Sequence, residues 1–186
     1  MDVFISLKGS DRPFADSFIT ENLKGQNKFK YWYLFDIQKD KTGEDTKETI
    51  INKIENSSGA LLLVSNDFLK SEFILNYELP AIFKKKEIND SYKIIPVFVE
   101  NCDISKNKYL NNLEFFNSPG TNLHTLQNRS AKEYSEKVGE INNFINKNLS
   151  RTQFVSSLFK KSKFFISSIA LFILLYFFTQ TFNENN

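Results

Sequence analysis

A short apolar run followed by helix-capping residues constrains the fold of this chain more than any other feature. Residues 60–64 read ALLLV, a run of strand length without a polar residue, which is typical of a strand covered on both faces. Residues 65–67, Ser-Asn-Asp, then break the run and supply N-cap chemistry, and apolar residues recur at roughly helical spacing as far as Ile82. We therefore expect a buried strand that passes directly into a helix, which is the repeating unit of an α/β fold.

Strands and helices are predicted to alternate along the rest of the chain. Besides residues 60–64, we expect strands over residues 3–6, 31–35 and 93–99, and a short fifth strand near residues 123–126. Such alternation favours a doubly wound parallel sheet of five strands with helices on both faces.

Capping patterns place the helices between these strands. The first helix is expected over residues 11–23, with Ser10 as its N-cap candidate. Capping-box patterns, in which an acid follows the N-cap residue three positions later, open further helices at Asp45 and at Ser130.

Composition limits the classes of function. A formal net charge of +2 with mixed signs gives no electrostatic footprint for a nucleic-acid partner.

The single cysteine, Cys102, excludes an intrachain disulfide and suits a reducing compartment; we interpret it as a small packed residue at a strand exit. His124 is the only histidine, so we expect no His-rich metal site. A dyad of Cys102 and His124 is the alternative, although neither lies in a recognisable nucleophile motif.

An uncharged apolar segment lies near the end of the chain, over residues 164–182. Nineteen residues span about 28 Å as a helix, close to the thickness of the hydrocarbon core of a bilayer. Lys160, Lys161 and Lys163 precede the segment, and the positive-inside rule places that side in the cytoplasm. We expect a single-pass, tail-anchored membrane protein; a buried core helix is the alternative. The predicted division is a cytoplasmic globular domain, a basic linker, a transmembrane helix and a short tail: residues 1–150, 151–163, 164–182 and 183–186.

Several segments occur in an order and spacing that form one larger pattern. They are residues 2–6 with Asp11, residues 35–36 with residues 42–45, residues 62–74, residues 78–80, and residues 94–97 with residues 102–103. Together they resemble the Toll/interleukin-1 receptor (TIR) domain family, bacterial type, over about residues 1–150. The resemblance implies the flavodoxin-like TIR fold. It also implies cleavage of NAD between nicotinamide and ribose, with NAD as substrate and no cofactor.

The resemblance also implies the site. Glu78 matches the catalytic glutamate of the family, and a preorganised carboxylate stabilises the positive charge that the ribose acquires as nicotinamide departs. The expected substrate-binding residues are Ser6, Lys8, Gly9, Asp36, Gly43, Phe73 and Ile74.

Two positions differ from many enzymes of this family. The tryptophan one helical turn before the glutamate is Ile74 here, and the aromatic residue just past the loop glycine is replaced by Asp45 and Thr46. The candidates for stacking on a base in their place are Trp32, Tyr33 and Tyr77.

These expectations combine into a membrane-anchored TIR-domain NAD glycohydrolase that acts as an antiviral defence or stress effector. The product is either ADP-ribose or a cyclic ADP-ribose. The expected partners are other copies of the chain, through TIR–TIR contacts of the loop over residues 36–45, and an upstream sensor of unknown identity. The alternative is a non-enzymatic TIR adaptor that recruits partners at a membrane.

Overall fold

The computed structural model describes residues 2–23, 29–33 and 43–149. The chain divides into two units, residues 1–149 and residues 150–186. The predicted transmembrane helix over residues 164–182 belongs to the second unit and lies outside the described residues. Within the described residues, no helix is both long enough and apolar enough to cross a membrane.

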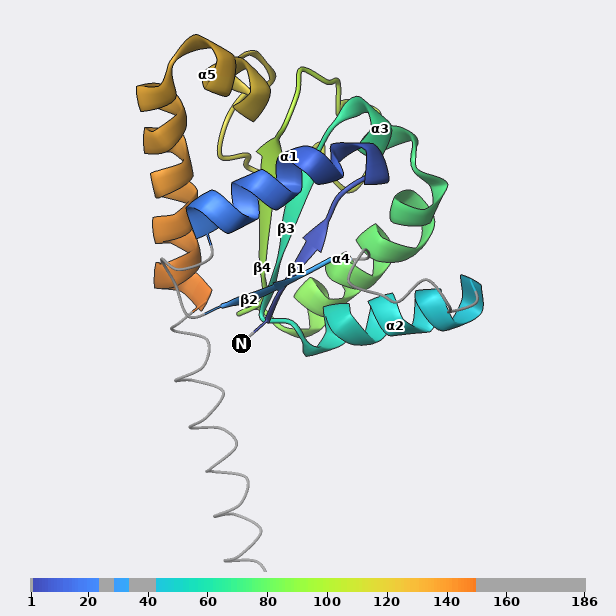
Figure 1. Ribbon diagram of the computed structural model, residues 1–186. Helices are drawn as coiled ribbons and strands as arrows, with labels where there is room; N and C mark the ends of the chain where they lie inside the picture. The colour runs from blue at the N-terminus through green and yellow to red at the C-terminus, as the bar shows by residue number, and fades with distance from the viewer. Residues whose placement is uncertain (1, 24–28, 34–42, 150–186) are drawn as a thin grey trace, which may run out of the picture. The chain divides into compact units, whose positions relative to one another are not determined.

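A parallel sheet of four strands forms the centre of the described chain, in the order β2-β1-β3-β4 (Figure 1). The strands are β1 Asp2–Ser6, β2 Lys30–Trp32, β3 Gly59–Val64 and β4 Lys93–Phe98. The α/β class and the parallel sheet are confirmed. Because β2 and β3 lie on opposite sides of β1, the winding direction reverses between β1 and β3. Ligands of open α/β sheets bind outside the carboxyl ends of the strands at such a switch point.

The prediction of a fifth strand near residues 123–126 is wrong. This segment opens helix α5, Leu123–Arg129. The Asn122 side chain caps the helix by accepting a hydrogen bond from the Thr125 N–H at 2.9 Å. Both leucines of the segment are buried, and their spacing of three residues places them on one face of a helix.

The edge of β4 is covered by side-chain and loop groups where a fifth strand would otherwise pair. The Asn117 amide accepts a hydrogen bond from the Phe98 N–H and donates one to the Phe98 carbonyl, both at 2.8 Å. The Phe116 N–H donates to the Pro96 carbonyl at 3.2 Å. A proline is tolerated in β4 because edge strands need fewer ladder hydrogen bonds. The sheet therefore ends at β4 in the described residues.

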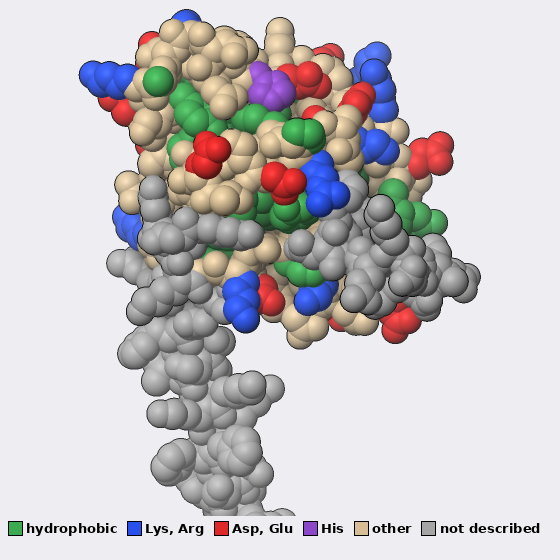
Figure 2. Space-filling model, viewed as in Figure 1, with side chains coloured by type: hydrophobic (Ala, Val, Ile, Leu, Met, Phe, Trp, Pro, Cys, Tyr) green, Lys and Arg blue, Asp and Glu red, His purple; other side chains and the backbone are tan. Residues whose placement is uncertain are grey.

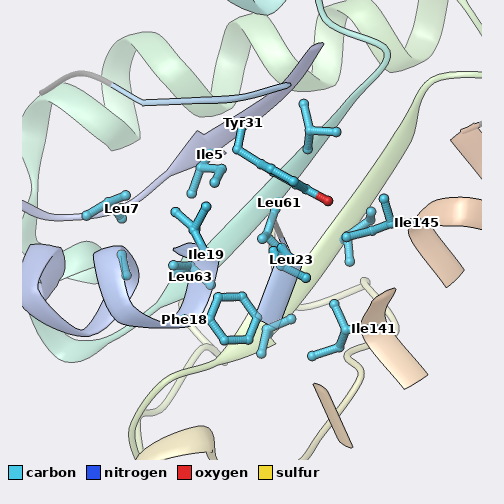
Figure 3. Close-up of a cluster of buried hydrophobic side chains, with 14 of the residues drawn as sticks. Ile5, Leu7, Phe18, Ile19, Leu23, Tyr31, Leu61, Leu63, Ile141 and Ile145 are labelled. Atoms are coloured by element: carbon cyan, nitrogen blue, oxygen red, sulfur yellow. The ribbon is translucent and has the colours of Figure 1, made fainter. Parts of the chain in front are cut away.

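Helices cover both faces of the sheet (Figure 1). One face carries α1 Arg12–Ser17, the π-helical turn η2 Phe18–Leu23, α5, and a helix over residues 131–149. The other face carries α2 Gly43–Asn56, α3 Asn66–Lys70, the π-helical turn η4 Ile74–Glu78, and α4 Leu79–Ile88. Side chains alternate along β1, so that Ile5 packs in the first cluster and Phe4 in the second. Figure 3 shows part of the first cluster: Ile5, Leu61, Leu63, Phe18, Ile19, Leu23, Ile141 and Ile145.

Two of the expected helix starts are wrong. A 3-10 turn, η1 Gly9–Asp11, precedes α1, and the N-cap position of α1 is Asp11 instead of Ser10. Ser10 lies inside the 3-10 turn, and its hydroxyl donates to the Asp67 carboxylate at 2.8 Å. Helix α2 begins at Gly43, two residues before the expected cap at Asp45.

The expected N-cap at Ser130 is confirmed. Its hydroxyl accepts a hydrogen bond from the Glu133 N–H at 3.3 Å, at the start of the helix over residues 131–149. The Glu133 side chain pairs with Arg129 one turn earlier.

Close contacts fix the strands and helices at the amino ends of β3 and β4, opposite the switch point. A Cβ atom at Gly59 would lie 2.8 Å from the Lys93 carbonyl oxygen, so only glycine fits where β3 begins. The Lys85 ammonium of α4 donates to the carbonyls of Ile54 at 2.9 Å and Glu55 at 2.6 Å, in the last turn of α2. A cation at the carboxyl end of a helix is favourable, and here it ties α4 to α2.

Candidate active site

Glu78 lies where η4 passes into α4. The Leu79 N–H donates to the Ile74 carbonyl, which is the five-residue spacing of a π-helix. Pro80 follows at once and has no N–H to continue a regular α-helical ladder. Single π-helical turns of this kind occur frequently at functional sites. The side chain that this turn presents is 3% exposed.

The Glu78 carboxylate meets the carboxyl end of β1. Its Oε2 accepts a hydrogen bond from the Ser6 hydroxyl, and both residues are buried. Burial raises the pKa of Glu78 to about 7, while the Ser6 hydrogen bond acts in the opposite direction. A carboxyl group with this pKa changes its charge near neutral pH, as acid–base and electrostatic catalysts do.

A second serine–carboxylate pair lies at the same switch point, with the serine after β3 and the carboxylate after β1. The Ser65 hydroxyl, just after β3, donates to Asp11 Oδ2 at 2.6 Å, and it also accepts from the Phe68 N–H at 3.0 Å as the N-cap of α3. Burial raises the pKa of Asp11, and the bond from Ser65 opposes that change. The two pairs bring the segments that follow β1 and β3 together.

Charged side chains surround the second pair. The carboxylates of Glu100 and Asp67 raise the pKa of Asp11, and His124 lowers it. Figure 2 shows the single histidine, His124, at the surface beside acidic side chains. No group of three or more potential metal ligands occurs within residues 2–23, 29–33 and 43–149.

Comparison with known proteins shows the family of this chain. A family model described as "TIR domain" matches residues 3–132, which include β1, β3 and Glu78. The chain belongs to the TIR domain family. It is also 27% identical, over 140 residues, to a probable 2' cyclic ADP-D-ribose synthase, TcpO, of Methanobrevibacter olleyae. That match covers 75% of this chain, and it spans 39% of the length of TcpO.

Most of the other expected site residues of this TIR domain lie near the carboxyl end of β1 or on the segment before Glu78. Lys8 and Gly9 are exposed and follow β1 directly at the start of η1. Gly43 is the first residue of α2. Asp36, with the first part of the predicted loop, lies outside the described residues.

Ile74, at the position of the family tryptophan, and its neighbour Phe73 have different environments. Ile74 is 2% exposed and belongs to the core cluster of its face of the sheet. Phe73 is half-buried and packs against Tyr77, with ring centroids 5.3 Å apart. Tyr77 is 38% exposed, and the Lys47 ammonium lies 4.1 Å from its ring centroid.

Of the three candidates for base stacking, two already pack against other side chains of the TIR domain. The Trp32 ring stacks on the Phe4 ring, with ring centroids 5.7 Å apart. Tyr33 is buried, and its hydroxyl donates a hydrogen bond to Asp16. Tyr77 is the most exposed of the three.

Cys102 is a packed residue, as expected. It is 6% exposed, and its Sγ lies 3.9 Å from the Val64 carbonyl oxygen. Burial raises the pKa of its thiol to about 11, so the thiolate that a nucleophile needs is disfavoured. His124 packs instead against Phe14, with ring centroids 4.6 Å apart.

The bond between Ser65 and Asp11 was not expected from the sequence. N-cap chemistry was expected from residues 65–67, and the structure places the cap at Ser65; Asp11 was expected as part of a family motif. The available signal was positional, because each residue follows the carboxyl end of a strand. Neighbouring parallel strands bring such residues to the same edge of the sheet.

Proposed function

We propose that this TIR domain cleaves NAD between nicotinamide and ribose, with Glu78 as the catalytic carboxylate. The observation that carries the proposal is a buried carboxylate at the switch point of a TIR-family sheet, held by a single hydroxyl, with a pKa of about 7. The likeness to TcpO supports the same class of substrate.

The carboxylate is suited to the charge that this reaction creates. When the bond between nicotinamide and C1 of the ribose breaks, the electron pair leaves with nicotinamide, and positive charge develops on the ribose. An ionised Glu78 in a poorly solvated site stabilises that charge, as carboxylates do in glycoside cleavage. C1 then takes a water oxygen or a hydroxyl oxygen of the same ADP-ribose, with loss of a proton. The products are ADP-ribose or a cyclic ADP-ribose, and the name of TcpO favours the cyclic product.

The test is a measurement of nicotinamide release from NAD by the purified full chain. Glu78→Gln keeps the size of the side chain and removes its charge, so we expect the rate to fall by about 10²-fold or more. Glu87→Gln is the matched control, because Glu87 is exposed on α4 and is expected to leave the rate unchanged. A Glu78→Gln protein that cleaves NAD at the wild-type rate would remove Glu78 from the mechanism. Chromatography of the products separates hydrolysis from cyclisation.

Self-association is the second part of the proposal. We expect contacts between copies of the chain to complete the site, and an upstream partner to trigger assembly in a defence or stress response. The rate per molecule should then rise with protein concentration. A strictly constant rate per molecule over a hundredfold dilution would show that one copy is sufficient.

A membrane anchor formed by residues 164–182 is the third part. The composition of the segment and the lysines before it support an orientation with the TIR domain in the cytoplasm. Deletion of residues 164–182 should move the protein from the membrane fraction to the soluble fraction. A protein that stays in the same fraction after the deletion would contradict the anchor.

The alternative is a non-enzymatic adaptor, and a specific surface favours it. An apolar groove of about 520 Å³ lies between α2 and α4. Its rim includes Tyr77 and Ile88, and Ile88 is 77% exposed. Exposed apolar surface of this kind is typical of contacts with other proteins. An assembled, folded wild-type protein that releases no nicotinamide from NAD would favour the adaptor.

A further inference from the structure

The alternation of side chains along β1 directs Ser6 toward Glu78. Phe4 packs in the cluster on the side of α2, α3 and α4, and Ser6 lies two residues further along the same strand, hence on the same face. Neighbouring positions on β3 that face this side are apolar, including Leu62 and Val64. A fully buried hydroxyl among such residues is unfavourable unless it forms a hydrogen bond.

The hydrogen bond of Ser6 goes to a side chain that is distant in sequence. Its hydroxyl donates to Glu78 Oε2, 72 residues away. Within the described part of the chain, Glu78 Oε1 accepts no hydrogen bond. The Ser6 hydroxyl thus distinguishes the two carboxylate oxygens, because it holds Oε2 and not Oε1.

We propose that Ser6 is a positioning residue for Glu78, whose hydroxyl holds Oε2 and so leaves Oε1 as the oxygen that meets the substrate. This inference rests on the proposed function for its catalytic consequence. It differs from the expectation that Ser6 binds substrate itself, because the hydroxyl donates its proton to Glu78 and acts through that carboxylate.

The bond also favours the ionised form of Glu78. A hydroxyl donates more strongly to a carboxylate than to a neutral carboxyl group, so the bond stabilises the charge that catalysis needs. Burial acts against that charge, and no charged side chain in the described residues contributes to the pKa of Glu78. Ser6 is therefore the group that opposes the effect of burial.

A purely structural pair would behave differently. If Ser6 only satisfies a buried acid, its loss lowers stability and leaves the turnover of bound substrate unchanged. If Ser6 positions an ionised Glu78, its loss raises the pKa of Glu78 and lowers kcat more than it changes KM.

The decisive experiment follows the Glu78 carboxyl group directly. The full chain is labelled with ¹³C at glutamate carboxyl carbons, and Glu78→Gln identifies the Glu78 signal. We expect Ser6→Ala to raise the pKa of Glu78 by about one, the scale of one hydrogen bond to a charged group. Ser10→Ala is the matched control, because Ser10 donates to Asp67 at the same end of the sheet. An unchanged Glu78 titration in Ser6→Ala overturns the proposal.

A second pair of variants keeps the test valid if Ser6→Ala fails to fold. Thr and Val have nearly the same shape and differ in the hydroxyl, so Ser6→Thr should keep the wild-type titration and Ser6→Val should show the raised pKa. Equal titrations in the two variants overturn the proposal. In an active protein, kcat at pH 7 should fall about tenfold in Ser6→Ala and recover in Ser6→Thr. A wild-type protein without NAD cleavage but with the expected titrations would contradict the proposed function alone.

Discussion

Two serine–carboxylate pairs cross the switch point in opposite directions, and their environments differ. In one pair the serine ends β1 and the acid follows β3, as Ser6 and Glu78; in the other the serine follows β3 and the acid follows β1, as Ser65 and Asp11. Ser65 also caps a helix, so its pair is part of the scaffold. Ser6 makes no cap, and its partner is the more deeply buried acid.

The same two functional groups therefore acquire different roles from their surroundings. Asp11 is half-exposed and lies among other charges, so solvent and neighbours share control of its ionisation. The ionisation of Glu78 depends on burial and on one hydroxyl. A group controlled by so few contacts is easily tuned, which is the property expected of the catalytic member of the two pairs.

The largest expected effect that separates the pairs is the dependence of activity on pH. If NAD cleavage needs ionised Glu78, with its pKa of about 7, kcat/KM should fall about tenfold per pH unit below 7, or about 10²-fold at pH 5. Rates of nicotinamide release between pH 5 and pH 9 give this profile. Asp11→Asn should leave the fall of kcat/KM at low pH unchanged. If that fall moves to another pH in Asp11→Asn, the ionisation that controls activity belongs to the Ser65–Asp11 pair.

The next effect is on the pH dependence of stability. The pKa of Glu78 is about 7 in the folded protein against 4.5 for the ordinary side chain, so the folded state retains its proton more strongly. The resulting stabilisation is complete below pH 4.5 and is lost as pH rises through 7. It amounts to at most about 3 kcal/mol. Relative to wild type, Glu78→Gln should therefore gain stability between pH 5 and pH 8, measured by denaturant unfolding. A constant difference between the two proteins would contradict the raised pKa.

Local sequence signals predicted most of the sheet, and the resemblance to the TIR family pointed to the central acid. The apolar run of β3 and its cap at Ser65 are local features, and they appear as expected. The fifth strand was wrong because Leu123 and Leu126 fit a short strand or one face of a helix equally well. The cap at Asn122 and the covering of the β4 edge by Asn117 decide between these structures.

Long-range pairing accounts for what the sequence did not reveal about the site. Ser6 and Glu78 were each expected in the site, but their hydrogen bond depends on the register of β1 and on the π-helical turn before Pro80. Ser10 satisfies the local rule for an N-cap, yet it lies in a 3-10 turn and its hydroxyl bonds to a carboxylate 57 residues away. Patterns along the chain do not encode such distant partners.

A smaller effect should identify the scaffold pair. Ser65→Ala removes both the N-cap of α3 and the donor to Asp11, so we expect a loss of about 1–2 kcal/mol in the free energy of unfolding. Ser65→Thr retains both hydrogen bonds and should recover most of this loss. Urea unfolding at pH 7 measures both variants. A Ser65→Ala protein as stable as wild type would show that the pair has no scaffold role.

The smallest expected effect comes from the Ser10–Asp67 bond, which lies beside the scaffold pair. It joins the same two segments at 2.8 Å, but both side chains are exposed. Water replaces an exposed hydrogen bond at little net cost, so Ser10→Ala should change the free energy of unfolding by less than about 0.5 kcal/mol. The comparison with Ser65→Ala then measures burial and the N-cap together, because both substitutions delete a serine hydroxyl bound to an aspartate but Ser65 is the one that is buried and caps a helix. Equal losses in the two variants would mean that the number of bonds across the switch point, and not their burial, determines how firmly β1 and β3 are joined.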